Sequence, residues 1–248
     1  MSSKHFDFIG FEDFRRRAQD PSLSPAEKIG FPDAVRAGRD AEILEDALGK
    51  LGPLDTPGKR ILDIGCGCSD LPLMLLEFCR ARDHSIVLVD SQEMLDLVPD
   101  HPNGRKCAGA FPDNLAAITA LHARYDAILI YSVAQVVFAE GNIFRFLDAA
   151  AGLLDHGGRM LVGDVPNAGM RRRFLASPAG RKHHHENYDP NSDPVVDFNT
   201  LEPRAIDDAV VLGWLARYRS AGFHAYVMPQ DPRLGMANRR EDVLICRP

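Results

Sequence analysis

Apolar and polar positions follow two different patterns along the chain. Over roughly the first 55 residues, apolar positions recur at helical spacing, and Pro21, Pro25 and Gly52 interrupt the pattern. After that point, short apolar runs alternate with amphipathic stretches, which is typical of a parallel sheet with crossover helices. The pattern therefore predicts a helical segment over residues 1–55 and an α/β domain over residues 56–248.

Strands are predicted where apolar residues follow one another, because a strand covered on both faces lacks polar alternation. Such runs lie at residues 60–65, 85–90, 106–109, 125–132, 158–165, 223–229 and 241–247. Between the runs, helical spacing predicts helices over residues 71–82, 92–97, 114–123, 142–154 and 208–221. Strands and helices thus alternate through most of the domain.

Residues 166–206 interrupt this alternation and are predicted to form a lid insertion, since so long a stretch without a pattern is often functional. The basic cluster of Arg171–Arg173, Arg181 and Lys182 indicates either a solvated charge run or a clamp for a phosphate or carboxylate on a substrate. His183–His185 follow, and His184 is a candidate general base. No metal is expected, because consecutive residues rarely reach one ion.

Composition and charge narrow the class of partner. The chain has 35 acidic and 29 basic residues and a formal charge of -6, which disfavours a nucleic-acid surface. No apolar run approaches the roughly 20 residues of a membrane span, and the first residues lack the features of a signal peptide, so we expect a cytoplasmic protein. Five cysteines, most within apolar runs, suit buried thiols better than disulfides.

The stretch RILDIGCGCSDLPLMLL, residues 60–76, is typical of a strand, a tight turn and a helix. Gly65 and Gly67 allow a sharp turn with a ligand against the backbone. In the dinucleotide pattern GxGxxG, the third position would be Asp70, whose charge opposes a pyrophosphate at the helix N-terminus. A dinucleotide is therefore disfavoured.

Two carboxylates point to another ligand. Asp63 precedes the turn and Asp90 ends the second strand, so both face the crevice at the carboxyl edge of the sheet. A carboxylate at Asp90 is placed to accept hydrogen bonds from ribose hydroxyls, and one at Asp63 can face an ammonium group. An adenosine linked to an amino acid carries both groups.

Four segments, LDIGCGCSDLP, VLVDSQEML, YDAILIYSVAQVV and LLDHGGRMLVGDV, together resemble the class I S-adenosylmethionine-dependent methyltransferases over about residues 58–165. The resemblance implies a Rossmann-like, doubly wound, mostly parallel seven-stranded sheet with an antiparallel C-terminal strand, an N-terminal helical cover, and S-adenosyl-L-methionine as cofactor. The cofactor-binding residues that it implies are Asp63, Gly65, Cys66 and Gly67 for the methionine part, Asp90 and Ser91 for the ribose, Ala110 and Phe111 for the adenine, and Tyr131 with Ser132 where substrate and sulfonium meet.

This chain departs from the family pattern at two positions. Ser69 stands where the family has the third glycine of GxGxG. Ala110 stands where many members carry an acid for the adenine amine, so Asp113 or a backbone carbonyl is expected to replace it. Neither departure removes the carboxylates at Asp63 and Asp90.

The resemblance predicts methyl transfer to an oxygen or nitrogen of a small, anionic metabolite, with a sugar or sugar-nucleotide among the candidates. Beside His184, Asp164 and Tyr131 are the candidate catalytic groups. The aromatic residues Phe8, Phe11, Phe14 and Phe31 are expected either to line the substrate pocket or to pack in the core. Four alternatives stay open: an RNA methyltransferase, a protein methyltransferase, a nicotinamide-dependent oxidoreductase and a non-catalytic binding module. A homo-oligomer is also left open.

Overall fold

A computed structural model describes residues 9–52 and 54–248 of the chain. Phe8, one of the aromatic residues considered for the substrate pocket, lies outside the described residues. In this part of the chain, no helix is both long enough and apolar enough to cross a bilayer.

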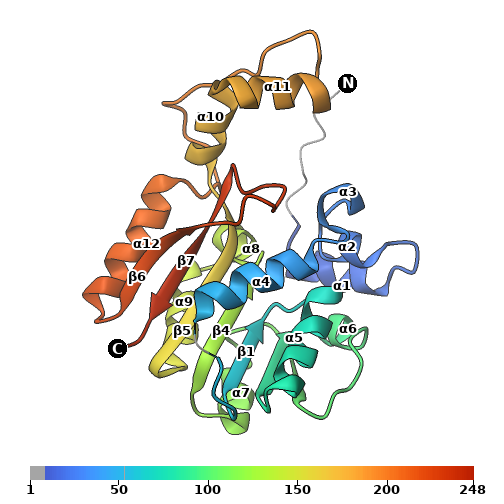
Figure 1. The fold of residues 1–248 in the computed structure, drawn as a ribbon, viewed down its shortest axis with the longest axis vertical. Helices are drawn as coiled ribbons and strands as arrows, with labels where there is room; N and C mark the ends of the chain where they lie inside the picture. Colours follow the sequence, from blue (N-terminus) through green and yellow to red (C-terminus); the bar gives the residue numbers. More distant parts are fainter. Residues whose placement is uncertain (1–8, 53) are drawn as a thin grey trace.

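Seven strands form one sheet in the spatial order β3-β2-β1-β4-β5-β7-β6 (Figure 1). β1 to β5 pair in parallel, whereas β7 runs antiparallel to β5 and β6. The strands are β1 (Arg60–Ile64), β2 (Ser85–Asp90), β3 (Gly104–Ala108), β4 (Tyr125–Tyr131), β5 (Leu154–Pro166), β6 (His224–Pro229) and β7 (Arg240–Cys246). The predicted Rossmann-like α/β sheet with an antiparallel C-terminal strand is confirmed. The strand order reverses between β1 and β4, where folds of this kind form a ligand crevice.

Helices cover both faces of the sheet, and alternate strand residues contribute to two separate cores. Ile61 packs in one core and its neighbour Leu62 in the other. The first core includes residues of α4 (Asp40–Leu51), α5 (Asp70–Ala81) and α6 (Gln92–Leu95), and the second includes residues of α7 (Leu115–Leu121), α8 (Ala134–Glu140), α9 (Ile143–Gly152) and α12 (Asp208–Ser220). Burial on both faces explains the continuous apolar runs.

The N-terminal segment forms four helices that pack on the domain at the crevice end of the sheet (Figure 1). α4 is preceded by the shorter helices α1 (Phe11–Gln19), α2 (Pro25–Lys28) and α3 (Asp33–Arg36). Two contacts fasten α1 in place: the Arg15 guanidinium pairs with Glu93 of α6 at 2.7 Å, and the Phe11 N–H donates to Glu140 of α8 at 3.1 Å. The segment is thus joined to both sides of the crevice.

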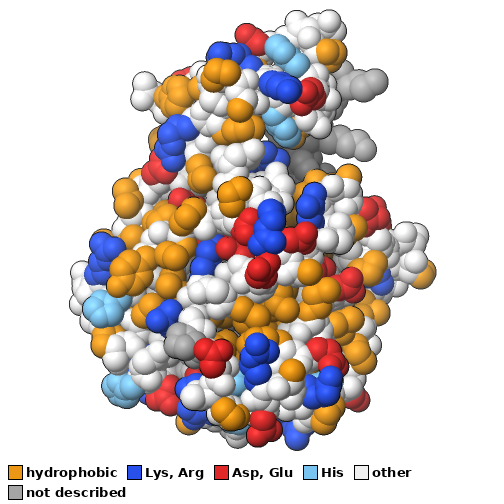
Figure 2. Space-filling view, viewed as in Figure 1, with side chains coloured by type: hydrophobic (Ala, Val, Ile, Leu, Met, Phe, Trp, Pro, Cys, Tyr) orange, Lys and Arg blue, Asp and Glu red, His pale blue; other side chains and the backbone are white. Residues whose placement is uncertain are grey.

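Residues 166–206 project from the body of the molecule, and the structure differs here from the irregular lid that the pattern predicts (Figures 1 and 2). Two helices form, α10 (Ala168–Ala176) and α11 (Pro178–Asn187). The Asn167 side chain caps the first helix and the Ser177 side chain caps the second. α10 is mostly half-buried and α11 is mostly exposed, and each has a single buried residue. Neither therefore has the long apolar stripe that would reveal a helix by its spacing.

Candidate cofactor and active site

A cavity lies at the carboxyl ends of β1, β2 and β4, with an empty volume of about 1220 Å³ when its open mouth is included. Its lining extends from the glycine turn past Asp90 to Ala110 and Phe111, so the cavity spans the ends of neighbouring strands. The glycine turn forms its floor, and Phe11, Phe14 and Phe31 of the N-terminal segment line it from above the turn. The cavity is therefore enclosed by two regions that are far apart in sequence.

The glycine turn has the backbone conformation that its sequence predicts. Gly65 and Gly67 have φ values of 76° and 64°, which side chains other than glycine rarely adopt. A Cβ atom at Gly65 would lie 2.4 Å from Val133, and one at Gly67 would lie 2.7 Å from Ile29. Ser69, at the position of the third glycine, caps α5 by accepting the Leu71 N–H at 3.4 Å. The Ser69 hydroxyl thus stabilises the start of α5.

Asp63 is a buried carboxylate that lines the cavity, with 2% of its surface exposed. No described residue donates a hydrogen bond to its Oδ2 atom. Burial, and then the nearby charge of Asp90, raise the pKa of Asp63 to about 8. A buried acceptor without a partner is costly, so Asp63 is suited to receive a cationic donor from a ligand.

Asp90 lies at the end of β2, and each of its oxygens accepts one backbone hydrogen bond. The Gly67 N–H donates to Oδ2 at 2.9 Å and the Ser91 N–H donates to Oδ1 at 2.7 Å. Burial nevertheless raises the pKa of Asp90, because these two bonds only partly offset the loss of solvent. A carboxylate oxygen has a second lone pair, so both atoms can still accept hydroxyl protons from a ligand.

The part of the cavity beyond Asp90 is apolar. Met94, Ala110 and Phe111 line it, and the Phe111 ring packs edge-on against Phe146 at 5.0 Å between ring centroids. Asp113, considered as a replacement for the missing acid at Ala110, is exposed and pairs with Arg145 at 2.7 Å. It is absent from the cavity lining, so a flat apolar group would meet side chains that offer contact area and no charge.

Arg36 and Asp40 are two buried charges that the sequence patterns did not single out. The Arg36 guanidinium lines the cavity between the rings of Phe31 and Tyr131, at 5.5 and 5.3 Å from their centroids, and pairs with Asp40 at 3.2 Å. Asp40 in turn accepts the Asp70 N–H at the start of α5. Two carboxylates therefore occupy the helix terminus where a pyrophosphate would bind, and this disfavours a dinucleotide.

The three candidate catalytic residues lie in different places. Tyr131 lines the cavity, and burial raises the pKa of its hydroxyl, so it keeps its proton at neutral pH. Asp164 lies behind the cavity, where its carboxylate accepts the Ser132 hydroxyl at 2.5 Å and the Arg240 guanidinium at 2.6 Å. His184 lies on α11, stacked on Tyr188, and is absent from the cavity lining. The structure brings Tyr131 and Asp164 together and leaves His184 apart.

The basic run of the projecting segment is paired internally. Arg171 and Arg172 both donate to Glu202, at 2.8 and 2.7 Å, and Arg173 pairs with Asp208 at 2.5 Å. None of the three lines the cavity. Among the described residues, no group of three or more histidine, cysteine or acidic side chains is arranged to hold a metal ion. The run therefore stabilises the projecting segment, through Glu202 within it and through Asp208 at the start of α12.

Comparison with solved structures identifies the fold. The chain is similar to a chain of the complex between the Haloferax volcanii Trm112 methyltransferase activator and a methyltransferase, at 12% identity and a TM-score of 0.58, covering 95% of this chain and 98% of that one. It is also similar to the plantazolicin methyltransferase BpumL in complex with SAH, at 14% identity and a TM-score of 0.58, over 96% of each chain. The chain has the fold of the class I S-adenosylmethionine-dependent methyltransferases.

This methyltransferase fold extends over nearly the whole chain, including the N-terminal segment. A third similar structure is the O-methyltransferase family 2 protein from Planctomyces limnophilus in complex with apigenin, at 17% identity and a TM-score of 0.50, covering 95% of this chain and 65% of that one. No protein-family model and no curated protein matches the sequence. Because the sequence identities to these structures are only 12–17%, the structural similarity establishes the fold alone.

Proposed function

We propose that the protein is an S-adenosylmethionine-dependent methyltransferase. One observation carries the proposal: the buried Oδ2 atom of Asp63 has no partner in the described chain, and it faces a cavity that also holds Asp90 and the glycine turn. Asp63 would receive the ammonium of the methionine part and Asp90 the ribose hydroxyls. The methyltransferase fold, whose similar structures include one in complex with SAH, supports the same ligand.

The remaining cavity residues fit the other parts of this cofactor. Arg36 is a buried cation that lines the cavity and pairs through Nε with Asp40 at 3.2 Å, and its other guanidinium N–H groups would pair with the methionine carboxylate. Met94, Ala110 and Phe111 would contact the adenine ring. Opposite charges at Asp63 and Arg36 thus match the two charges of a free amino acid.

When bound, S-adenosylmethionine supplies a methyl group that already carries its leaving group. The chain has to hold the acceptor atom in line with that methyl group and exclude water. Phe11, Phe14 and Phe31 line the cavity, and their apolar rings would reduce the access of water to the reacting groups. We propose that Tyr131 and Asp164 act near the acceptor, and the proposal assigns no role to His184 because that residue lies on the projecting helix.

We propose that the acceptor is a small molecule methylated on oxygen or nitrogen. The expectation of an anionic acceptor rested on Arg171–Arg173, Arg181 and Lys182. The first three pair with Glu202 and Asp208, Lys182 pairs with Glu186, and none of the five lines the cavity, which removes that support. The excess of acidic over basic residues disfavours an RNA substrate, because RNA-binding proteins usually carry a basic surface. A nicotinamide dinucleotide would meet Asp40 and Asp70 at the start of α5. The cytoplasmic location stays a prediction.

The proposal is tested by isothermal titration calorimetry with S-adenosylhomocysteine, with 5′-methylthioadenosine, which lacks the amino acid, and with NADH. We expect the wild-type protein to bind the first two ligands and not the third. Asp90→Asn should weaken both adenosine ligands, while Asp63→Asn should weaken S-adenosylhomocysteine alone. Asp155→Asn, a surface substitution far from the cavity lining, is the matched control. Failure of the folded wild-type protein to bind S-adenosylhomocysteine would contradict the proposal.

A further inference from the structure

Ser132 and Asp164 are two residues in the left-handed backbone region that meet at the carboxyl edge of the sheet. Both have a φ of 60°, and the Ser132 hydroxyl donates to Asp164 Oδ2 at 2.5 Å. A residue other than glycine in this region is strained, and such residues concentrate at functional sites. The surrounding structure must therefore hold this pair in place.

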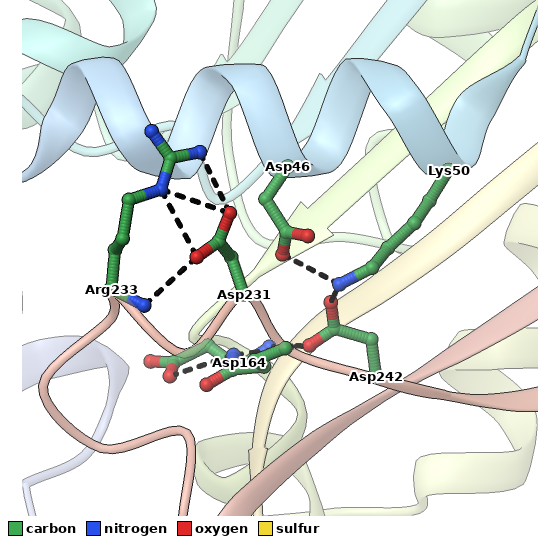
Figure 3. Close-up of polar contacts among 7 residues, drawn as sticks. Asp46, Lys50, Asp164, Asp231, Arg233 and Asp242 are labelled. Atoms are coloured by element: carbon green, nitrogen blue, oxygen red, sulfur yellow. Dashed lines mark hydrogen bonds and ion pairs between the residues drawn. The ribbon is translucent and has the colours of Figure 1, made fainter.

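Asp164 is held from several sides by a buried polar network. Arg240 donates to its Oδ2 atom at 2.6 Å, and Gln230 donates to Oδ1 at 3.3 Å. The Asp164 N–H donates to Asp242, and Lys50 reaches from α4 to pair with Asp242 at 2.7 Å (Figure 3). The Asp164 carboxylate is thus fixed as the acceptor of the Ser132 proton.

Ser132 is the member of this pair that lines the main cavity, whereas Asp164 lines a small second cavity beside it. Since its proton is donated to Asp164, the Ser132 oxygen presents only lone pairs to the main cavity. A group that binds there must carry a proton to donate. An acceptor atom that hydrogen-bonds to Ser132 would therefore belong to a hydroxyl or an N–H group.

The surroundings of Ser132 narrow the choice further. Phe31 and Tyr131 line both cavities. Beside Ser132, the main cavity is lined by Val133, Val136 and Val137, so this space favours an apolar body, whereas the second cavity also has charged and polar side chains in its lining. An amine, which is cationic at neutral pH, would meet the guanidinium of Arg36 there and, behind Ser132, that of Arg240. A carboxylate has no proton to give to Ser132. A phenol satisfies each condition, and its proton, with a pKa of about 10, leaves more readily than that of water, whose pKa is far higher.

Resting on the proposed function, we infer that the acceptor is a small phenol whose hydroxyl donates to Ser132 while Asp164 receives the serine proton. As the bond from the phenol oxygen to the methyl carbon forms, the bond from that carbon to sulfur breaks and its electron pair stays on sulfur. The phenol proton passes to Ser132 Oγ, and the serine proton passes to Asp164 Oδ2. Ser132 is then a catalytic residue, and Asp164 is a positioning residue that acts through it.

The inference is tested with S-adenosylmethionine carrying a deuterated methyl group, with products detected by mass spectrometry. The acceptors are phenol, catechol, 4-hydroxybenzoate and 4-nitrophenol, compared with benzyl alcohol, benzylamine and benzoate. We expect methylation of phenols, with kcat/KM at least about tenfold above the other three. Ser132→Ala should lower kcat for phenol about 100-fold and leave KM within about threefold. The matched control Ser220→Ala should change neither constant.

Two further readouts separate proton transfer from a structural role. The loss caused by Ser132→Ala should shrink to less than about tenfold with 4-nitrophenol, whose hydroxyl is far more acidic, and should also shrink at high pH. Asp164→Asn should reproduce both trends, and its fold is checked by binding of S-adenosylhomocysteine.

Three results would overturn the inference while the proposed function stands. The first is binding of S-adenosylhomocysteine with no phenol methylated, and the second is a preference for the amine or the carboxylate. The third is an equal loss for every phenol in Ser132→Ala. Failure to bind S-adenosylhomocysteine would instead remove the proposed function itself.

Discussion

The charged residues of the cavity and those of the projecting segment differ in both burial and pairing. At the cavity, Asp63 is buried and its Oδ2 atom has no partner in the described chain. On the projecting segment, Arg171 and Arg173 are exposed, yet each is paired with an acid. A buried polar atom without a partner is expensive and persists where a ligand can satisfy it, whereas exposed ion pairs contribute little. This difference favours the cavity as the functional site, although the projecting segment carries the longer run of charged residues.

The largest effect is expected from the glycine turn. Gly67→Val would place a branched side chain at a φ of 64° and a Cβ atom 2.7 Å from Ile29. We expect the affinity for S-adenosylhomocysteine to fall at least about 100-fold, since both the turn and its approach to the ligand change. Calorimetry measures the effect, and Gly213→Val in α12, where a Cβ meets no atom within 4 Å, controls for general loss of stability. Near wild-type binding by Gly67→Val would show that the turn does not hold the ligand.

The next effect concerns the carboxylate below the turn. Asp63→Asn keeps the shape of the side chain and removes the charge that would pair with an ammonium. We expect S-adenosylhomocysteine to bind about 30-fold more weakly, equivalent to about 2 kcal/mol, and 5′-methylthioadenosine to bind as it does to the wild type. Calorimetry with both ligands provides the measurement. Equal weakening of the two ligands would mean that Asp63 acts on the turn and not on the amino acid.

The cost of burying Asp63 should be visible in the pH dependence of stability. Its pKa is about 8 in the folded protein and near 3.8 when unfolded, so the folded state holds one more proton between these values. Stability from this group is complete below pH 4 and is lost as the pH rises through 8, by up to about 1.4 kcal/mol per pH unit. Urea unfolding from pH 5 to 8 should therefore show Asp63→Asn gaining stability relative to the wild type.

Asp155→Asn serves as the control for this pH series. Asp155 pairs with Arg60, and that pairing lowers its pKa, so it does not titrate between pH 5 and 8. The difference in unfolding free energy between this variant and the wild type should stay constant over the range. A constant difference for Asp63→Asn as well would refute an elevated pKa at Asp63.

The smallest effect is expected from the projecting segment. Its ends are close together, since the Ala168 N–H donates to the Ile206 carbonyl at 2.9 Å. Replacing residues 169–205 with four glycines should therefore leave the affinity for S-adenosylhomocysteine within about twofold of wild type. Arg171→Ala should have as little effect on calorimetric affinity. A tenfold loss in either variant would place the segment in the cofactor site and end the contrast with the cavity.

The sheet could be predicted because burial on both faces leaves a plain signal. The apolar runs at Ile86–Val89 and Ile128–Ile130 correspond to buried residues of β2 and β4. The helices of the projecting segment could not be predicted in this way, because neither has a continuous buried face and their caps at Asn167 and Ser177 are single residues. Elements without a clear pattern of apolar and polar positions therefore could not be predicted from the sequence.

For the site, Asp63 and Asp90 could be expected because they stand at fixed distances from the glycine turn. Arg36 could not, since it reaches the cavity only through the packing of α3 and α4 against the domain. Its one sequence signal is the spacing of four residues to Asp40, which is typical of a helical ion pair. Ser132 was expected near the substrate, but its hydrogen bond to Asp164 depends on two left-handed residues that no pattern encodes.

The central claim is that the buried carboxylate of Asp63 binds the ammonium group of the cofactor. Proton release on cofactor binding tests this claim. At pH 7 a group with a pKa of about 8 is mostly protonated, and it must ionise to pair with the amino group of S-adenosylhomocysteine. Titrations in two buffers of different ionisation enthalpy should therefore show release of close to one proton at pH 7. The release should vanish in Asp63→Asn, and the wild-type affinity should rise with pH towards 8. Binding without proton release, at an affinity that does not change between pH 6 and 8, would contradict the assignment.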